Sequence, residues 1–149
     1  MNPAPPVILD DPPGTALGMK LSGRVVLTRA RGSPYLWDVL DAGPLGLIVT
    51  DDPGNSSDLM ARLDLSGDEF AYLGPRLDYF SLTPCERRAL RMIAFGLSNA
   101  EMAARLGRKV STVNTQVAAV LTKLGVPNRH AARALYWGHP ITPDLNHYG

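Results

Sequence analysis

Apolar residues recur at helical spacing through residues 82–137, and capping residues divide this stretch into segments. A serine, threonine or asparagine precedes three of the segments, and a glycine follows all four. Such side chains accept hydrogen bonds from the free N–H groups at a helix start, and glycine adopts the left-handed conformation common after a helix end. The pattern therefore predicts four helices, over residues 84–95, 99–106, 110–124 and 129–137.

Two of these helix starts have the residues of a capping box. Thr83 is followed three residues later by Glu86, and Ser98 is followed in the same way by Glu101. In a capping box the hydroxyl accepts from the N–H of the glutamate, and the carboxylate accepts from the N–H of the cap residue. Only residues 107–109 separate the second and third predicted helices. This short connection indicates a helix-turn-helix domain.

The third predicted helix has one apolar face and one small, neutral, polar face. At 3.6 residues per turn, Val117, Val120 and Leu124 fall within about 40° of Val113. A helix whose other face carries only short side chains can enter the major groove of DNA, where base edges are read. We therefore predict base contacts from Ser111, Asn114, Thr115 and Ala118.

Asn114 lies on the flank of this small polar face. An asparagine amide can form two hydrogen bonds with adenine, so this residue predicts an adenine in the bound sequence. The alternative is that Asn114 is an ordinary solvent-exposed helix residue.

The first half of the chain has a different pattern, with short apolar runs bounded by turn residues. These runs are typical of buried strands, over residues 7–9, 24–27, 47–49 and, more weakly, 70–73. Helical patterns begin at Ser33-Pro34 and at Ser57-Asp58, whereas glycines interrupt residues 14–20. Alternating strands and helices favour an α/β fold with a parallel sheet.

The fold class predicted for the whole chain is thus α/β followed by all-α. We expect a small parallel-sheet domain over residues 1–73, a linker over 74–81 that contains Pro75, and a four-helix domain over 82–149.

Charge divides the chain at the same place. Residues 1–80 hold 6 Lys and Arg against 11 Asp and Glu, a net charge of −5, whereas residues 81–149 hold 9 against 3, a net charge of +6. A basic half beside an acidic half indicates that a polyanion binds the second half only.

From the remaining composition we expect the protein to be cytoplasmic. No apolar run approaches the roughly 20 residues that span a bilayer, so we expect no membrane partner. The first residues lack the pattern of a secretion signal, and Cys85 is the only cysteine. The three histidines have no metal-ligand spacing, and we expect neither a metal nor another cofactor.

The motifs of the second half resemble the LuxR/NarL-type DNA-binding domain of bacterial transcription regulators. They are Leu82-Thr83-Pro84 with Glu86, Gly96-Leu97-Ser98-Asn99 with Glu101-Met102-Ala103, Thr112-Val113, and Lys123-Leu124-Gly125-Val126 with Asn128-Arg129. The sequence departs from the usual pattern at Asn114, where lysine is usual, at Gln116, where histidine is usual, and at Lys109, where serine is usual. The resemblance implies double-stranded DNA as the partner.

Contacts with the DNA backbone require cations and backbone donors beside the helix that enters the groove. The resemblance supports Lys123 and the helix start at Ser98-Asn99 in this role, and position adds the cations of the turn. The expected backbone contacts are Ser98, Asn99, Arg108, Lys109, Thr112, Lys123 and Arg129.

The fourth helix forms the dimer contact in the resembling family. We therefore expect a homodimer on an inverted repeat, with an interface of exposed residues at Ala131, Ala134, Leu135 and Tyr136. The alternative is that Tyr136 and Trp137 pack on the first half of the chain.

The first half resembles a shortened receiver domain of a response regulator. By position Asp10 and Asp11 match the magnesium-binding acidic pair, and Asp51 matches the phosphoacceptor. Acids after parallel strands are expected to meet in one crevice. The hydroxyl and lysine that usually complete such a site are missing, and Asp51-Asp52-Pro53-Gly54 is also explained as a solvated turn.

The sequence therefore predicts a transcription regulator that is not an enzyme, whose first half is a regulatory or dimerisation module. Two alternatives remain at this point. One is a response regulator that depends on phosphorylation of Asp51, and the other is a protein that docks on RNA polymerase or a sigma factor.

Overall fold

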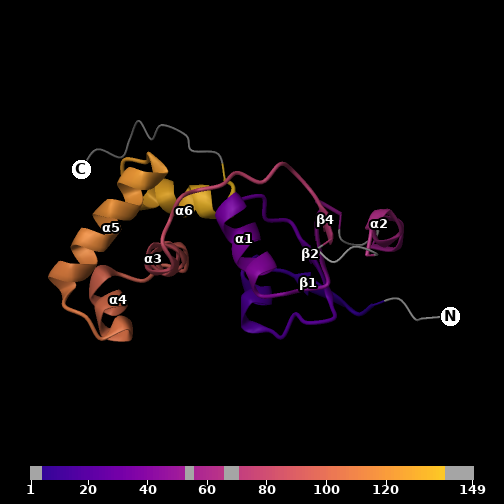
Figure 1. Cartoon of the computed structure of the whole chain (residues 1–149), viewed down its shortest axis with the longest axis horizontal. Helices are drawn as coiled ribbons and strands as arrows, with labels where there is room; N and C mark the ends of the chain where they lie inside the picture. Colours follow the sequence, from indigo (N-terminus) through magenta and orange to yellow (C-terminus); the bar gives the residue numbers. More distant parts are fainter. Residues whose placement is uncertain (1–4, 53–55, 66–70, 140–149) are drawn as a thin grey trace. The chain divides into compact units, whose positions relative to one another are not determined.

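The computed structural model describes residues 5–52, 56–65 and 71–139 (Figure 1). The chain divides into two compact units, unit 1 over Met1–Asp78 and unit 2 over Tyr79–Gly149. Each unit is described by itself below.

The described part of unit 1 is built on a four-stranded parallel sheet with its strands in sequence order. The strands are β1 Val7–Asp10, β2 Val25–Thr28, β3 Gly46–Val49 and β4 Ala71–Leu73. Val7 pairs with Val25, Val25 with Gly46, and Gly46 with Ala71. The predicted parallel α/β fold is confirmed.

Helical segments connect the strands as the sequence predicts. They are a single short 3-10 helix, η1 Thr15–Gly18, and two α-helices, α1 Ser33–Asp41 and α2 Ser56–Arg62. The glycine-interrupted segment forms only η1, because Gly14 already has a positive φ of 108° at its start. Figure 1 shows α1 and α2 on opposite sides of the sheet.

Alternate residues of the strands therefore pack against different helices. Residues of β2, β3 and β4 and the residue just after α2 form one buried cluster, made of Val25, Leu27, Ile48, Leu63 and Ala71, against which Leu59 and Met60 of α2 pack. On the other side, α1 buries Tyr35, Leu36 and Val39 completely. Burial of such side chains contributes about 1.5–3 kcal/mol each, which makes this two-sided core the main support of the sheet.

The segment expected to link the two halves is hydrogen-bonded to unit 1. The Asp78 N–H donates to Ser33 Oγ at 2.8 Å, and Trp37 Nε1 donates to the Asp78 carbonyl at 2.9 Å. The Tyr72 hydroxyl donates to the Pro75 carbonyl at 2.6 Å. Residues 75–78 therefore belong structurally to the α/β unit.

The end of β1 carries a carboxylate buried among donors. Asp10 is 1% exposed. Its Oδ1 accepts from Gly14 N at 3.1 Å and from Ala16 N at 2.8 Å, and its Oδ2 accepts from Thr28 Oγ1 and Tyr35 Oη at 2.7 Å each. Burial raises the pKa of the Tyr35 phenol, and the hydrogen bond to Asp10 raises it further. Asp10 thus joins β1, β2, α1 and the turn before η1.

The described part of unit 2 consists of four helices. They are α3 Pro84–Ala94, α4 Asn99–Leu106, α5 Val110–Leu124 and α6 Arg129–Trp137. Both predicted capping boxes are formed, at Thr83 and at Ser98, and Asn128 caps α6 through a bond from the Ala131 N–H. Gly107, Gly125 and Gly138 follow α4, α5 and α6 in the left-handed conformation. The predicted boundaries of α4, α5 and α6 are confirmed, and α3 ends one residue before the predicted position, at Ala94.

The core of unit 2 lies between these helices. α3 supplies Leu90 and Ile93, α4 supplies Met102, and α6 supplies Tyr136, each no more than 2% exposed. The predicted apolar face of α5 is buried through Val113, Val117 and Val120. Because that face is used inside the unit, the opposite face of α5 is turned to solvent.

We predict that Asp10→Ala destabilises unit 1 by about 3–5 kcal/mol, because it leaves several buried donors without an acceptor. Urea unfolding of the full chain, followed by Trp37 fluorescence in a Trp137→Phe background, measures this change. Asp11→Ala is the matched control, since Asp11 is exposed. Equal unfolding midpoints for the two variants would contradict the structural role of Asp10.

Candidate nucleic-acid interface

The helix-turn-helix consists of α4, the turn at residues 107–109, and α5. The turn is tight because Gly107 takes a φ of 63° and the Arg108 N–H donates back to the Ala103 carbonyl at 3.0 Å. α5 then begins at Val110 with Lys109 as its cap residue, whose side chain makes no capping hydrogen bond. The chain therefore places an exposed cation immediately before α5.

The predicted base-contact residues all lie exposed on α5. These residues are Ser111, Asn114, Thr115 and Ala118. The Thr115 hydroxyl donates to the Ser111 carbonyl at 3.2 Å. Its proton is thereby occupied, and what it offers to a ligand is a methyl group and an acceptor oxygen. The side chains of this exposed face are therefore short and uncharged. The polar ones among them offer both donors and acceptors, which suits contact with base edges.

Three predicted backbone contacts near α5 are exposed. They are Arg108, Lys109 and Thr112. Arg108 lies in the turn, and its side chain contacts both α5 and α3. Its Nη1 donates to Gln116 Oε1 at 3.4 Å, and its Nη2 lies 3.8 Å from Cys85 Sγ. These are long contacts at an exposed site, so the guanidinium can leave them for a phosphate at little cost.

A row of hydrogen bonds links α6, α4 and α5 at the other end of α4. Arg129 Nη2 donates to the Leu97 carbonyl at 2.7 Å, and Arg129 Nη1 donates to Asn99 Oδ1 at 2.8 Å. Asn99 Nδ2 then donates to Asn114 Oδ1 at 2.8 Å. Arg129 and Asn99, which are predicted to contact the DNA backbone, are therefore hydrogen-bonded in a row with Asn114, which is predicted to contact a base.

Ser98 has a structural role next to this row. Its hydroxyl accepts from the Glu101 N–H at 3.1 Å, and its own N–H donates to Glu101 Oε1 at 3.0 Å. The first N–H groups of α4 that these bonds do not use remain near the exposed surface, and such groups favour anions.

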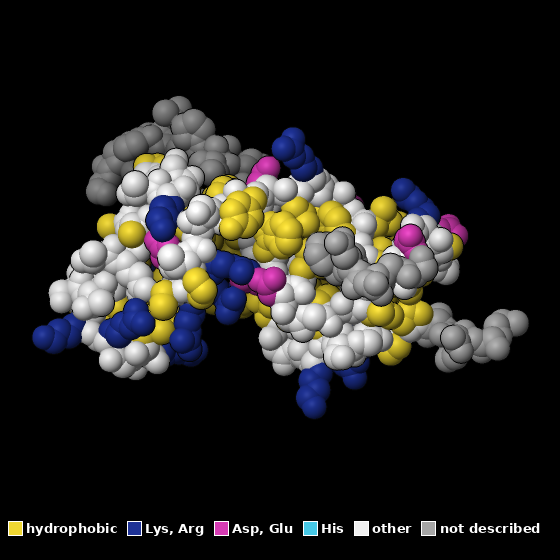
Figure 2. All heavy atoms as spheres, in the orientation of Figure 1, with side chains coloured by type: hydrophobic (Ala, Val, Ile, Leu, Met, Phe, Trp, Pro, Cys, Tyr) yellow, Lys and Arg dark blue, Asp and Glu magenta, His cyan; other side chains and the backbone are white. Residues whose placement is uncertain are grey.

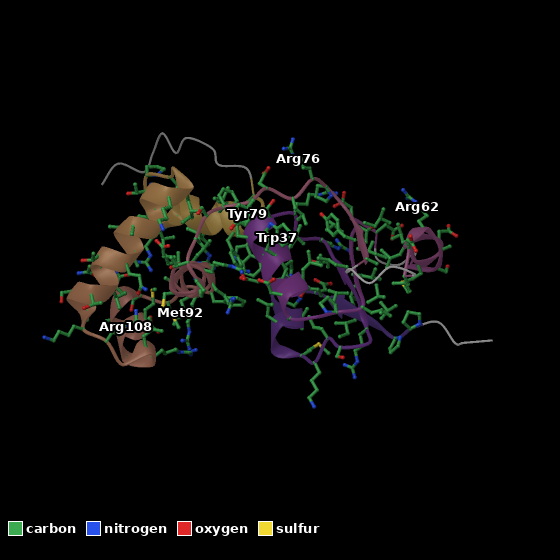
Figure 3. The ribbon with its side chains drawn as sticks, in the orientation of Figure 1. Trp37, Arg62, Arg76, Tyr79, Met92 and Arg108 are labelled. Atoms are coloured by element: carbon green, nitrogen blue, oxygen red, sulfur yellow. The ribbon has the colours of Figure 1, made fainter. Side chains whose placement is uncertain are left out.

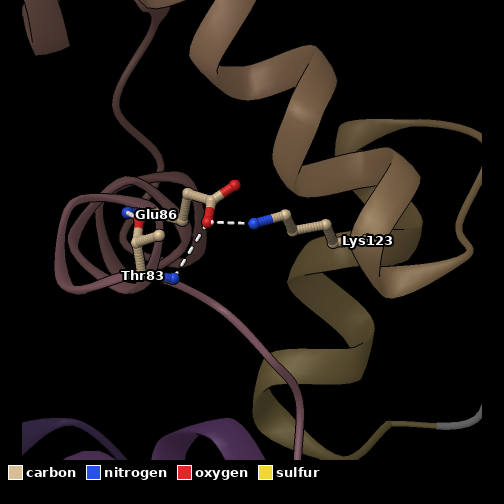
Figure 4. Close-up of polar contacts among 3 residues, drawn as sticks. All are labelled: Thr83, Glu86 and Lys123. Carbon is tan, nitrogen blue, oxygen red and sulfur yellow. Dashed lines mark hydrogen bonds and ion pairs between the residues drawn. The ribbon is translucent and has the colours of Figure 1, made fainter.

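Lys123 is joined to the capping box of α3 (Figure 4). Its Nζ lies 2.7 Å from Glu86 Oε1, which also accepts from the Thr83 N–H at 2.9 Å. The Glu86 side chain is 9% exposed and the Lys123 side chain 44%. The hydrogen bond from Lys123, and next the Thr83 N–H, hold the pKa of Glu86 below its ordinary value of 4.5.

This ion pair is the feature that sequence reasoning missed. Glu86 is visible in the sequence as a capping residue, but its partner lies 37 positions away on another helix. The only available signal was a lysine at the end of α5, and that position also suits the helix dipole or a phosphate.

The expected exposure of α6 is wrong at two residues. Ala131 is 7% exposed and Tyr136 is 0% exposed, because this face of α6 packs against α3. Trp137 Nε1 donates to the Ala94 carbonyl at 3.2 Å, and the rings of Phe95 and Trp137 meet edge to face at 5.4 Å. Tyr136 and Trp137 are thus part of unit 2. Of the proposed dimer contacts, Ala134 and Leu135 remain half-exposed.

The visible face of unit 2 in Figure 2 carries Lys and Arg side chains around its lower half, with few acidic side chains among them. This agrees with the net positive charge of residues 81–149, which hold 9 Lys and Arg against 3 Asp and Glu. Such a surface attracts a polyanion over distances set by the salt concentration.

The acidic residues of unit 1 do not meet in one crevice. β2 lies between β1 and β3, so Asp10 is in register with Thr28, and Thr28 with Val49. Asp51 has an 80% exposed side chain and pairs with Arg31 at 3.0 Å. The described residues contain no group of three or more His, Cys, Asp or Glu side chains that could hold a metal ion.

None of the helices in the described residues is both long enough and apolar enough to cross a bilayer.

Residues 80–135 match the family of bacterial regulatory proteins called the luxR family. This range begins just before α3 and ends within α6, so it includes the whole helix-turn-helix.

Two curated regulators share sequence with the chain. The probable HTH-type transcriptional regulator GfsR of Streptomyces halstedii is 33% identical over 102 residues, which cover 66% of this chain and 42% of GfsR. The putative HTH-type transcriptional regulator Rv0890c of Mycobacterium tuberculosis (strain ATCC 25618 / H37Rv) is 44% identical over 55 residues, 37% of this chain and 6% of that protein. The chain thus spans less than half the length of these two relatives.

A solved structure of RcsB from Salmonella enterica serovar Typhimurium, bound to the promoter rprA in the presence of BeF3-, is also similar. It is 24% identical, the alignment covers 76% of this chain and 58% of RcsB, and the TM-score is 0.44.

We predict that Lys123→Met destabilises unit 2 at pH 7 and that the difference from the wild type shrinks as the pH falls. Glu86 has a folded-state pKa below 4.5, so its contribution is present above that pH and is lost as the carboxylate becomes protonated at lower pH. Thermal unfolding midpoints at pH 7 and pH 3 measure the effect.

The matched control is Lys109→Met, which removes the same charge from an exposed residue that makes no capping bond. If Lys123→Met and Lys109→Met had the same pH dependence, the ion pair with Glu86 would have no effect on stability.

Proposed function

Because residues 80–135 form a helix-turn-helix domain of the luxR family, we propose that this chain is a transcriptional regulator that binds double-stranded DNA in a sequence-specific way. The observation that carries the proposal is the position of α5. Its valine face is buried in unit 2, and its small neutral face is exposed directly after two cations, Arg108 and Lys109.

In this proposal α5 lies in the major groove. Ser111, Asn114, Thr115 and Ala118 face the base edges, and their short side chains let the helix backbone approach closely. Arg108, Lys109 and Thr112 contact phosphates on the groove wall, and the free N–H groups at the start of α4, near Ser98 and Asn99, contact a phosphate of the same strand.

We assign a positioning role to Lys123 and Arg129. Both have close partners within unit 2, Glu86 for Lys123 and Asn99 with the Leu97 carbonyl for Arg129. A cation whose N–H groups already have close acceptors, a carboxylate for Lys123 and two neutral oxygens for Arg129, adds less to phosphate binding than an unpaired one, so these two residues orient α5 and α4 instead.

We further propose that two copies bind one inverted repeat through α6. Its half-exposed small and apolar residues, Ala134 and Leu135, allow a second helix to approach closely. Unit 1 then acts as a regulatory or dimerisation module in the cytoplasm, and the chain works by binding rather than by catalysis, without a cofactor.

The two other functions lack a supporting observation. Asp51 pairs with Arg31, and the acids expected to bind magnesium beside it lie elsewhere on the sheet. A chain that docked on RNA polymerase or a sigma factor through unit 2 would not need the uncharged face of α5, and it would bind no duplex on its own.

We predict that the full chain binds duplex DNA with an affinity that falls steeply with salt. Arg108→Ala and Lys109→Ala each weaken binding to all duplexes alike and reduce the slope of log affinity against log salt by about 1, because each removes one phosphate contact. Fluorescence anisotropy with a labelled duplex at several salt concentrations measures both effects.

The matched control is Arg62→Ala. Arg62 ends α2 in unit 1, and its side chain points away from the body of that unit (Figure 3). Loss of binding in Arg62→Ala equal to that in Arg108→Ala would mean that charge alone, and not the helix-turn-helix, carries the interaction.

We predict that Ala134→Glu abolishes the cooperative binding of two copies to an inverted repeat, because it places a charge in the proposed contact between two α6 helices. Binding to a single half-site stays within about twofold of the wild type, since Ala134 is half-exposed and lies on α6, away from the residues proposed to contact DNA. Analytical ultracentrifugation of the two complexes gives the stoichiometry. An unchanged 2:1 complex would exclude this face of α6.

A further inference from the structure

We propose that Arg129 and Asn99 hold the amide of Asn114 in one orientation, so that it presents N–H donors to DNA and selects guanine, whose major-groove edge has two acceptors, over adenine, whose edge has one. This inference rests on the proposed function, because it takes α5 as the helix that enters the major groove.

The donor and acceptor groups of these three side chains allow only one orientation of each amide. A guanidinium carries donors and no acceptor. Arg129 Nη1 lies 2.8 Å from the Asn99 amide, so the Asn99 atom that faces it must be the acceptor Oδ1. The Nδ2 group of Asn99 is then the atom 2.8 Å from Asn114, and the Asn114 atom that faces it must be Oδ1. Arg129 thus fixes the orientation of the Asn99 amide, and the Asn99 amide in turn fixes the orientation of the Asn114 amide.

The start of this row is firmly held. Arg129 is half-buried, and its Nη2 donates to the Leu97 carbonyl at 2.7 Å. It is also the first residue of α6, directly after Asn128, which caps that helix with a bond of 2.9 Å from the Ala131 N–H. Asn99 is half-buried at the first position of α4. Two helix starts therefore fix the side chain that contacts Asn114.

The far end of the row is exposed. Asn114 lies on the same face of α5 as Ser111 and Ala118, and its Oδ1 is turned toward Asn99. No residue in the described part of the chain accepts a hydrogen bond from its Nδ2 group. The two N–H donors of Asn114 are therefore available to a ligand, whereas its oxygen is engaged.

This arrangement decides which bases Asn114 favours. In the major groove guanine has two acceptors, O6 and N7, whereas adenine has one acceptor, N7, beside its N6 donor. A freely turning asparagine can offer an acceptor and a donor together, which is why adenine is expected for an isolated Asn114. The fixed amide can donate to both O6 and N7 of guanine, but at adenine it can use only N7, and a donor then faces the N6 donor. We expect a preference of roughly five- to tenfold for guanine over adenine, the effect of one net hydrogen bond.

Asn99→Asp tests the orientation by reversing it. A carboxylate has only acceptors, so Asn114 must turn its Nδ2 toward residue 99 and present Oδ1 to the DNA. The preferred base then changes from guanine to adenine, whose N6 can donate to Oδ1. Ala100→Asp is the matched control, because it adds the same charge at the next, exposed position of α4 without touching the row of hydrogen bonds.

The experiment begins with selection of bound duplexes from a random pool by the full wild-type chain. The position that loses its preference in Asn114→Ala is the one that Asn114 contacts. Dissociation constants at one salt concentration, on duplexes that differ only there, then give the ratio of the affinity for guanine to the affinity for adenine. Added charge weakens all duplexes alike and cancels in this ratio.

We expect the ratio to favour guanine in the wild type and in Ala100→Asp, and to invert in Asn99→Asp. Asn99→Ala is a second variant, in which the ratio falls below one because a freely turning Asn114 can bond adenine N7 and N6 together. Circular dichroism confirms that each variant is folded. An unchanged ratio in either Asn99 variant, or a wild-type preference for adenine, would overturn the inference and leave the proposed function intact. Wild-type protein that selects no sequence at all would overturn the proposed function.

Discussion

Burial of the valine face of α5 is the constraint on which the rest of unit 2 depends. Val113 and Val120 are fully buried, and Val117 is 6% exposed, in a core shared with α3 and α4. Rotating α5 by half a turn would expose these side chains and lose roughly 1.5–3 kcal/mol for each one. The same burial therefore holds the helix in place and turns its small polar face outward. Stability and the proposed recognition of DNA come from two sides of one helix.

Polar side chains then tie the helices together at their ends. Glu86 caps α3 and also binds Lys123 of α5, and Arg129 opens α6 and also binds Asn99 of α4. In each case a residue in the first turn of one helix also binds a side chain on another helix. Residues expected to bind phosphate are thus partly used to hold the domain together, and Asn114 is reached by one of these contacts. Fixed side chains of this kind support selective binding, because less conformational freedom is lost when a ligand binds.

In unit 1 a carboxylate expected to take part in chemistry has a structural role. Asp10 accepts four hydrogen bonds from three separate segments and is closed to solvent. Its position after a parallel strand resembles that of a magnesium ligand, yet its lone pairs are already used by the protein. The exposed Asp51 follows β3, two strands away from β1 and Asp10, and it pairs with Arg31.

Local patterns in the sequence determined the helices α3 to α6 in the described part of unit 2, both capping boxes and the parallel α/β character of unit 1. Caps, glycines and hydrophobic periodicity act over three to five residues, so they can be read without knowing the fold. The tertiary structure alone decided which partner each polar group finds. Glu86 meets Lys123 and Asn99 meets Asn114 across 37 and 15 residues, Tyr136 is buried rather than exposed, and β2 separates Asp10 from Asp51. Such outcomes depend on how helices and strands pack, because a charge or an amide carries no sequence signal for a partner on another element.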